Sequence, residues 1–380
     1  MPPKKISRPP LTWSQVSAFR LRRHHLVGER RADPALIARD ACGLQAQVMS
    51  AAELAFRARQ PDITRADIHS ALWKTRSLVK TSCMRGTLHI LAAADFPIYI
   101  TALRCSRVRS TLQIIARYGV TEREARDVME AAVETLAPGP LTRRELTERV
   151  LALGIARKKA KIWFRQSWWG VMRQALFEGF ICYGPDRGRE VTLVRTDQWL
   201  PKKREIPELE AQQTLLRCYL GAYGPATPRD FSKWSGLSSQ EAKGAWSSLE
   251  RDLAEVEWDA RKGFILQNDL DELYDARLDG RAVRLLPNFD TFLLGHWGKD
   301  HLVSAKHYKR VYRQAGWISP VVLADGKIIG IWSSKRHGER LAFEIFPFQK
   351  FSPAIRLDIE KEVASLGRFF ESSWEINYKK

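Results

Sequence analysis

Apolar and polar residues follow three similar cycles along this chain. Each cycle contains a threonine ahead of a basic–acidic–apolar run, in the phrases "DITRADIHSALW", "GPLTRRELTERV" and "GPATPRDFSKWSG". An acidic residue stands three positions after each threonine, which is typical of the capping box that starts a helix. These threonines are Thr64, Thr142 and Thr227. Their spacing of roughly 80 residues predicts one module used three times.

The segments after the helical runs are also similar to one another. The stretches "LVKTSCMRGTLHILAAAD", "GFICYGPDRGREVTLVRT" and "LAEVEWDARKGFILQND" alternate between apolar and polar residues and are rich in β-branched side chains. Helices succeeded by a β-hairpin are the pattern of a winged helix, whose hairpin flanks a helix at the DNA backbone. We therefore expect three tandem winged-helix modules, at residues 11–118, 119–205 and 206–280.

The pattern changes near Ala282, where strands dominate. "AVRLLPNF", "ISPVVLADGKIIGIW" and "LAFEIFPF" are typical of strands, and Asp325-Gly326 suits a tight hairpin turn. Ser352 and Pro353 suit the cap and first position of a last helix. Residues 281–380 are thus predicted to form a β-rich, barrel-like domain with a terminal helix, and the fold class of the whole chain is α+β.

One connector in the first module has an unusual composition. An Asp-Pro pair at 33–34 predicts a helix start, Gly43 predicts a left-handed helix end, and "SAAE" at 50–53 is typical of a capping box. Gln45 and Gln47 then lie between two helices. In an extended connector alternate side chains share one face, so both amides are expected to point the same way.

Two interpretations of this glutamine pair remain open. Each amide can cap a helix end or bond backbone, which is a structural role. Alternatively, the pair can hold a water at a sugar carbon and favour a developing oxocarbenium ion. That chemistry suits a base alkylated at N7 of guanine, because such a base is already cationic and leaves with little help from an acid.

Charge then indicates the partner. The 380 residues carry a net charge of +19, with a pI near 9.9. Such a balance favours nucleic acid first and an anionic membrane surface second. Candidate phosphate contacts lie beside a His-His pair and in a basic run interleaved with aromatic residues, where a solvated basic helix is the alternative. They are Arg20, Arg22, Arg23, Arg157, Lys158, Lys159, Lys161 and Arg165.

The segment "RGTLH" adds Arg85 and His89 to these candidates. Even spacing on a hairpin strand would place both on one face, at the mouth of a site or against phosphate. The alternative is an Arg–carboxylate pair with a half-buried histidine. Asp290 is either a distant electrostatic partner for the oxocarbenium ion or the cap of a turn.

Several classes of protein are excluded by missing motifs. No apolar run reaches the length of a membrane span, and the basic, proline-rich start is no signal peptide. The cysteines and histidines have no metal-ligand spacing, and no phosphate-binding loop occurs. We therefore expect a cytoplasmic protein without metal or nucleotide cofactor, with no membrane partner, acting as a monomer.

Four segments together resemble a known family. They are "GLQAQ" with "LAFRAR", "CMRGTLHILAAADFP", "LLPNFDTFLLGHWGKDHLV" and "GWISPVVLADGKIIGIW". In this order, over residues 11–375, they resemble the bacterial AlkZ/YcaQ-type winged-helix DNA glycosylases. The resemblance implies three winged helices and a C-terminal β-barrel around a C-shaped, concave DNA-binding surface.

The resemblance also implies an activity. The family removes N7-alkylated purines from double-stranded DNA by hydrolysis alone, including the unhooking of interstrand cross-links, in base-excision repair or self-resistance. Its Gln–apolar–Gln motif falls on Gln45 and Gln47, which would hold the attacking water. The family usually has a small residue where this chain has Asn288, which puts a local contact there in doubt.

Two rival classes remain on the sequence alone. A winged-helix transcriptional regulator would bind undamaged DNA and release no base. An architectural or RNA-binding protein would bind by backbone charge and ignore lesions. Neither rival needs two glutamines in a connector between helices.

Overall fold

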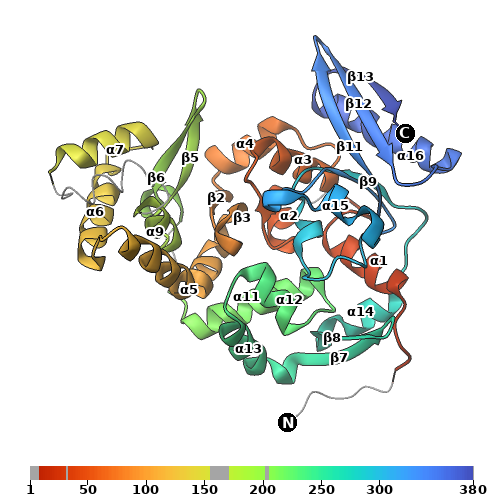
Figure 1. The fold of residues 1–380 in the computed structure, drawn as a ribbon, viewed down its shortest axis with the longest axis horizontal. Helices are drawn as coiled ribbons and strands as arrows, with labels where there is room; N and C mark the ends of the chain where they lie inside the picture. Colours follow the sequence, from red (N-terminus) through yellow and green to blue (C-terminus); the bar gives the residue numbers. More distant parts are fainter. Residues whose placement is uncertain (1–7, 31–32, 155–170, 202–204, 380) are drawn as a thin grey trace.

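The residues described by the computed structural model, drawn in Figure 1, are 8–30, 33–154, 171–201 and 205–379. Helices and strands are mixed throughout these ranges, as expected for the α+β class. Among the described residues, no helix is both long and apolar enough to cross a membrane. The chain opens with α1 (Trp13–Arg23), which starts at Thr12 in a capping box completed by Gln15.

The first unit runs from a short helix to a β-hairpin. Its elements are α2 (Pro34–Asp40), β1 (Leu44–Gln45), α3 (Met49–Arg59), α4 (Arg65–Trp73), β2 (Leu78–Ser82), η1 (Met84–Gly86) and β3 (Leu88–Ala92). A short turn, η2 (Ala93–Asp95), then leads into the long helix α5 (Phe96–Arg117). β1 pairs with β3, so the connector of the glutamines forms an edge of the hairpin.

The second unit has the same order of elements. They are α6 (Glu122–Thr135), β4 (Leu141–Thr142), α7 (Arg143–Ala152), α9 (Val171–Phe177), β5 (Ile181–Arg187) and β6 (Glu190–Arg195), followed by α10 (Thr196–Trp199). β4 pairs with β6 as β1 pairs with β3. The two hairpins join through Lys80 and Tyr183 into one six-stranded sheet, in the order β1-β3-β2-β5-β6-β4.

The third unit repeats the order once more. It comprises α11 (Glu208–Tyr223), α12 (Pro228–Ser235), α13 (Ser239–Ser248), η3 (Glu250–Asp252), β7 (Leu253–Trp258) and β8 (Arg261–Leu266), then η4 (Gln267–Asp269) and α14 (Leu270–Asp275). A single bridge from Ala226 to Phe264 replaces the short strand of the other units. Aromatic side chains of this unit pack with the first unit in one core, which contains Tyr99, Tyr219, Tyr223 and Trp234.

All three predicted threonine caps are confirmed as capping boxes. They do not, however, mark equivalent helices. Thr142 and Thr227 start the second helix of their units, whereas Thr64 starts α4, the third helix of the first unit. The second helix of the first unit, α3, begins after Val48 without any side-chain cap.

The C-terminal part contains a sheet that stays open. Its elements are β9 (Val283–Leu286), η5 (Thr291–Leu294), η6 (Ala305–His307), α15 (Tyr308–Val311), η7 (Gln314–Gly316), β10 (Val321–Ala324), β11 (Lys327–His337), β12 (Arg340–Pro347), α16 (Pro353–Phe369) and β13 (Ser373–Tyr378). The predicted turn at Asp325-Gly326 and the predicted cap at Ser352 are both present.

The barrel-like expectation for this part is wrong. The strand order is β13-β12-β11-β10-β9, and the two edge strands do not pair with each other. Ile359, Val363 and Leu366 of α16 are buried with Phe343 and Ile345 of β12. Because a helix covers the apolar face, the sheet has no need to close on itself to bury that face.

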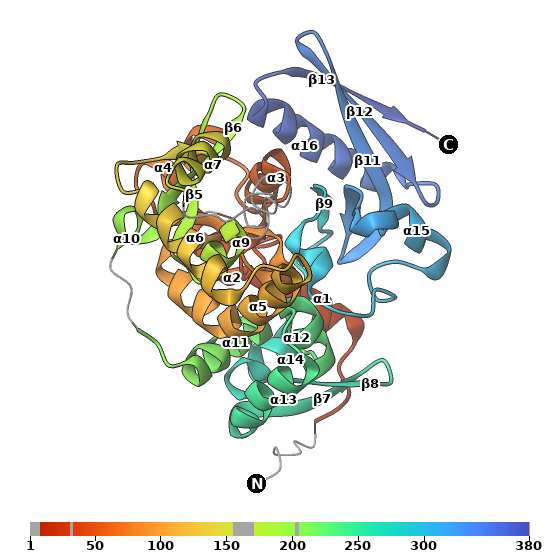
Figure 2. The same cartoon turned by 60° about the vertical axis from the view of Figure 1, so that its left-hand side comes forward.

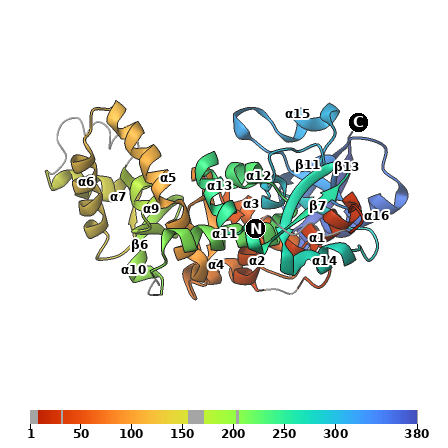
Figure 3. The same ribbon diagram turned by 90° about the horizontal axis from the view of Figure 1, so that it is seen from below.

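The parts lie in a row, with the first unit between the second unit and the C-terminal part. In Figure 3, α6 and α7 of the second unit lie at one end, α16 lies at the other, and α12 and α13 lie between them. Figure 2 shows α3 next to β9 and α16. There Arg57 donates to the Glu362 side chain and carbonyl, at 3.1 and 2.9 Å. The segment after the glutamines is therefore held by the C-terminal part.

Gly43 shapes the entry into this connector and gives a first prediction. Its φ is +85°, and an added Cβ would lie 2.6 Å from Leu91 Cδ2. Gly28 also has a positive φ, +76°, but nothing lies within 4 Å of its Cβ position. We expect Gly28→Ala to lower the free energy of unfolding by roughly 1–2 kcal/mol through backbone strain alone. Gly43→Ala should cost roughly 1–3 kcal/mol more through overlap. Urea unfolding of both variants tests this, and equal losses would contradict the packing argument.

Candidate functional site

The two glutamines lie on an edge strand and its continuation. Leu44 and Ala46 point into the core, at 0% and 1% exposed. Gln45 is 8% exposed and pairs across the sheet with His89, and Gln47 is exposed. The connector is thus extended, as predicted, and its alternate residues separate into an apolar and an amide set.

The amide oxygens of both glutamines already accept one hydrogen bond. Arg85 Nη2 donates to Gln45 Oε1 at 3.3 Å, and the Leu88 N–H donates to Gln47 Oε1 at 3.4 Å. The backbone is fixed as well, because the Ala46 N–H donates to the Leu88 carbonyl at 2.7 Å. An amide oxygen has two lone pairs, so each retains one for a further donor.

The capping box predicted at residues 50–53 is absent. Helix α3 begins at Met49, one residue before Ser50, and has no side-chain cap. Glu53 is buried and bonds instead to Arg65 at 3.0 Å and to His69 at 2.9 Å. The carboxylate is therefore engaged by the next helix, a contact that the local pattern does not reveal.

Arg85 is held in a turn rather than on a strand. Its φ of 54° is left-handed, and strand β3 begins only at Leu88. Its Nη1 donates to the Trp234 carbonyl at 2.6 Å, while its Nη2 reaches Gln45. Burial lowers the pKa of Arg85 to about 10, so it is still charged at neutral pH. Neither the predicted strand position nor the alternative of a carboxylate pair is correct.

The end of α12 explains how this cation can be buried. The last carbonyls of a helix lack partners and carry the negative end of its dipole. Arg107 donates to the Ser235 carbonyl at 2.6 Å, next to the Trp234 carbonyl that holds Arg85. The guanidinium groups of Arg85 and of Arg107 on α5 thus provide hydrogen bonds to the last two carbonyls of α12. Sequence reasoning missed Arg107 and the Trp234 carbonyl, because no local pattern marks either of them.

His89 is a neutral residue of this site. Its Nδ1 lies 3.0 Å from the Thr87 carbonyl, which can only accept, so Nδ1 carries the proton and Nε2 is free of one. Burial lowers the pKa of His89 to about 3, with a smaller contribution from the charge of Arg85. The side chain is buried, so it neither reaches a surface phosphate nor serves as an acid at neutral pH.

The three arginines near the start of the chain connect α1 to the third unit. Arg20 is 4% exposed and donates to the Gly224 and Pro225 carbonyls at 3.2 and 2.8 Å. Arg23 bonds both oxygens of Glu272 and also Asp269, and Arg22 donates to the Arg277 carbonyl at 2.6 Å. These bonds favour a structural role for Arg20 and Arg23 over phosphate contact.

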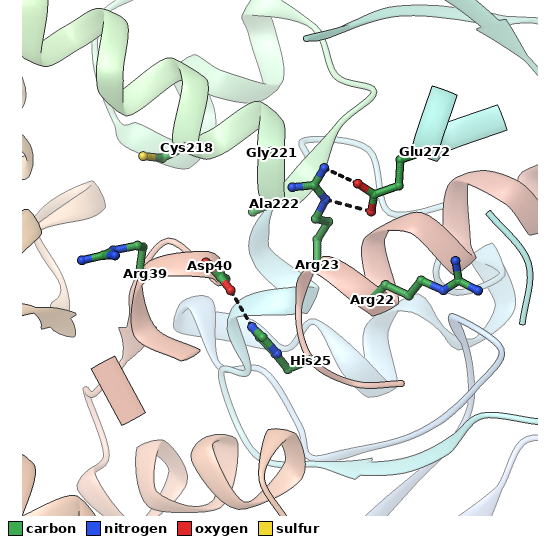
Figure 4. A pocket seen from close by; sticks show the side chains of 9 residues that line it. All are labelled: Arg22, Arg23, His25, Arg39, Asp40, Cys218, Gly221, Ala222 and Glu272. Carbon is green, nitrogen blue, oxygen red and sulfur yellow. Dashed lines mark hydrogen bonds and ion pairs between the residues drawn. The ribbon is translucent and has the colours of Figure 1, made fainter. Parts of the chain in front are cut away.

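A pocket of about 440 Å³ lies beside these arginines and is shown in Figure 4. Its charges are paired within the protein, since Arg23 bonds Glu272 and His25 bonds Asp40 at 2.7 Å. Nothing in the pocket resembles the glutamine site. The basic run Arg157, Lys158, Lys159, Lys161 and Arg165 lies outside the described residues.

Asp290 is held inside the protein by an ion pair and a backbone hydrogen bond. It forms a fully buried, bidentate ion pair with Arg59 at 2.8 and 2.9 Å, and it accepts from the Phe292 N–H at 2.9 Å. The interpretation as a turn cap is therefore correct, and the ion pair was missed. The only sequence signal for this ion pair was an arginine in the apolar stretch "LAFRAR".

Asn288 donates to the Ile318 carbonyl at 3.1 Å, a packing contact within the C-terminal part. Within the described ranges, no group of three or more His, Cys, Asp or Glu side chains is placed to hold a metal ion.

Comparisons with known proteins agree over nearly the whole chain. A sequence model of the family "DNA glycosylase AlkZ-like" matches residues 38–369. The interstrand DNA cross-link repair glycosylase of Streptomyces sahachiroi is 33% identical in an alignment of 364 residues, which covers 94% of this chain and 96% of that protein. The solved structure of Streptomyces sahachiroi DNA glycosylase AlkZ is similar with a TM-score of 0.85 at 30% identity, covering 98% of this chain and 100% of the other.

These matches define the class of the protein as a DNA glycosylase, an enzyme acting on N-glycosyl bonds. The chain belongs to the AlkZ-like family of DNA glycosylases, as the sequence resemblance predicted. The alternative of a DNA-binding regulator without catalysis is not favoured by them.

The buried histidines predict a loss of stability in mild acid. His24 and His89 are both buried, and burial holds the pKa of each well below 6.5. The unfolded chain binds these protons below pH 6.5 and the native chain does not, so stability is complete above pH 6.5 and falls as the pH falls. At pH 5 we expect a loss of about 2 kcal/mol for each histidine. Urea unfolding tests this: from pH 7 to pH 5, the free energy of unfolding should fall by about 2 kcal/mol less in His89→Gln than in the wild type. The exposed control His337→Gln should behave as the wild type, and an unchanged loss in His89→Gln would contradict the argument.

The ion pair of Asp290 gives another prediction. Asp290→Asn leaves the Arg59 charge buried without its carboxylate, so we expect the free energy of unfolding to fall by about 3–5 kcal/mol. Asp300→Asn breaks an exposed pair with Arg261 and should change it by under about 1 kcal/mol. Asp290→Asn with full stability and a slowed reaction would assign Asp290 to catalysis instead.

Proposed function

We propose that this enzyme hydrolyses the N-glycosidic bond of N7-alkylated guanine in double-stranded DNA, including guanines in interstrand cross-links. The observation that carries the proposal is the pair of anchored amides, Gln45 on the edge strand β1 and Gln47 in the segment that continues it. Their partners are Arg85 and a backbone N–H, not a carboxylate. No metal or nucleotide cofactor enters the proposed reaction, and the protein is expected to act as a monomer.

The amides suit a water molecule that attacks a sugar carbon. Each amide oxygen has one lone pair engaged and one left over, so a water can donate one hydrogen to each glutamine. Its own lone pair then points away from both and toward C1′ of the deoxyribose. The same oxygens place negative dipole ends near the oxocarbenium ion that develops there.

The leaving group determines which lesion this site can process. When the bond to an N7-alkylguanine breaks, the electron pair goes to the cationic base, which departs neutral. The positive charge passes to the sugar, the water adds at C1′, and its proton is released to solvent. No strong base or acid takes part, in keeping with a neutral His89 and two amides. A normal guanine would need protonation that these side chains cannot supply.

The three units are assigned as winged helices that bind the DNA backbone. Their similar order of helices followed by a hairpin supports this assignment, with a short strand after the first helix in two units and a single bridge at that place in the third. The proposed modules cover residues 11–118, 119–205 and 206–280, with a β-rich domain at 281–380. A cross-linked base cannot be flipped out readily. A concave surface with groove access to the glutamines would accommodate it, and the repair name of the Streptomyces sahachiroi relative supports cross-links as substrates.

Base release from a defined lesion tests this function. Single-turnover kinetics would use a duplex with one N7-methylguanine, with Gln45→Ala, Gln47→Ala and the double variant. We expect each single variant to lower the rate about 10²–10³-fold, as loss of one preorganised polar group does elsewhere. The loss in the double variant should be smaller than the product of the two single losses, since both glutamines hold one water.

Matched measurements make the outcome decisive. Gln198→Ala removes an exposed glutamine from α10 and should leave the rate unchanged. DNA affinity of the glutamine variants should stay within about twofold of wild type. If the wild type binds DNA but frees no base from this duplex or a cross-linked one, the proposed substrate is wrong.

A further inference from the structure

An exposed tryptophan lies at the start of α12. Trp297 follows η5 and is 51% exposed. Its backbone N–H donates to Asp230 Oδ1 at 2.8 Å, and the other oxygen of Asp230 completes the Thr227 capping box. The indole is thus fixed to the first turn of α12 although half of its surface is open to solvent.

Two cations of α12 flank this indole. Arg229 Cζ lies 5.1 Å and Lys233 Nζ 4.8 Å from the ring centroid. Residues four apart lie on the same side of a helix, so both cations approach the ring from α12. Both are exposed, and neither has an ion-pair partner among the described residues. An open aromatic face backed by unpaired cations is the arrangement that binds nucleic acid by stacking and charge.

The same helix connects Trp297 to the glutamine site. Trp297 is anchored at Asp230, and the carbonyl of Trp234, four residues further along α12, holds Arg85. Four residues of helix rise about 6 Å. The contacts that anchor Trp297 and Arg85 thus lie about one turn apart on α12, which fixes Trp297 relative to the glutamine site.

The surface continues from Trp297 toward α15. Tyr312 stacks on Tyr308 at 5.1 Å, whereas the Lys299 ammonium beside Tyr312 donates inward to the Leu293 and His296 carbonyls. Tyr308 is exposed, and three further cations that form no ion pair within the described ranges lie near it in the chain: Lys306, Lys309 and Arg313. In Figure 3, α5 and α15 rise on either side of α12 and α13. Charge complementarity along this strip favours one polyanionic strand as its occupant.

We propose that Trp297, Arg229 and Lys233 form a DNA-binding platform for the duplex strand that flanks the lesion. The indole packs its open face on a sugar or base of that strand, and the two cations bind its phosphates. The platform positions DNA and takes no part in bond cleavage. The reference to a lesion rests on the proposed function, whereas the binding of duplex does not.

Equilibrium binding at several salt concentrations tests the platform. The probes are one duplex with a single N7-methylguanine, the same duplex undamaged, and one of its strands alone. We expect Trp297→Ala to weaken both about 5–100-fold. Arg229→Gln and Lys233→Gln should each lower the slope of log affinity against log salt by about 0.9. At saturating protein, the single-turnover rate of all three variants should match the wild type.

Controls keep these outcomes separate from misfolding and from failure of the proposed reaction. Trp374 on β13 is 38% exposed, and Lys361 lies on α16 at the far edge of the molecule. Trp374→Ala and Lys361→Gln should leave affinity and slope unchanged, and Trp297→Phe should retain most of the affinity. Variants that bind duplex as the wild type does, or lose only single-strand binding, would overturn the proposal. If the wild type frees no base, only the reaction fails, because the affinities remain measurable.

Discussion

The contact between Arg85 and the end of α12 determines the geometry at the glutamine pair. A guanidinium buried without an anion is costly, and here the partner is a helix C-terminus that itself lacks hydrogen bonds. Each group satisfies the other, at 2.6 Å from Arg85 to the Trp234 carbonyl. The free arm of Arg85 then aims at Gln45. The orientation of one amide in the first unit thus depends on how the third unit docks.

The docking of the third unit against the first requires a glycine at position 236. This residue is left-handed, with φ +76°, and an added Cβ would lie 2.2 Å from Arg107 Nη2 and 3.1 Å from the Arg85 backbone. Only a residue without a side chain lets both arginines approach the helix end so closely. The core of tyrosines and tryptophans shared by the first and third units then fixes the approach. A rigid interface between units, rather than a single unit, is what positions the site.

Most features decided by neighbouring residues were predictable from the sequence, the capping box expected at residues 50–53 being the exception. Contacts across the chain were not predictable. The three threonine capping boxes, the left-handed Gly43 and the extended glutamine connector each depend on a few adjacent residues. Arg85, by contrast, meets a carbonyl 149 positions away, and Asp290 meets an arginine 231 positions away. Helix α16 also packs on β9, the first strand of the C-terminal part, so no strand pattern reveals that the sheet stays open. Charge in a sequence indicates a polyanionic partner, but it does not tell which arginines, such as Arg20, are bonded inside the protein.

The start of α3 differs from the start of the second helix in the other two units, because no side chain caps it. In the second and third units, the residue entering the second helix is a capping threonine, Thr142 or Thr227. At that place the first unit has Val48, directly after Gln47, and no side chain caps the helix. A threonine cap is worth about 1 kcal/mol. Departures from a local rule that the same fold obeys elsewhere are expected where function selects the residues. The start of α3 is therefore the place where the first unit departs from the other two, and the proposed catalytic amides stand directly before it.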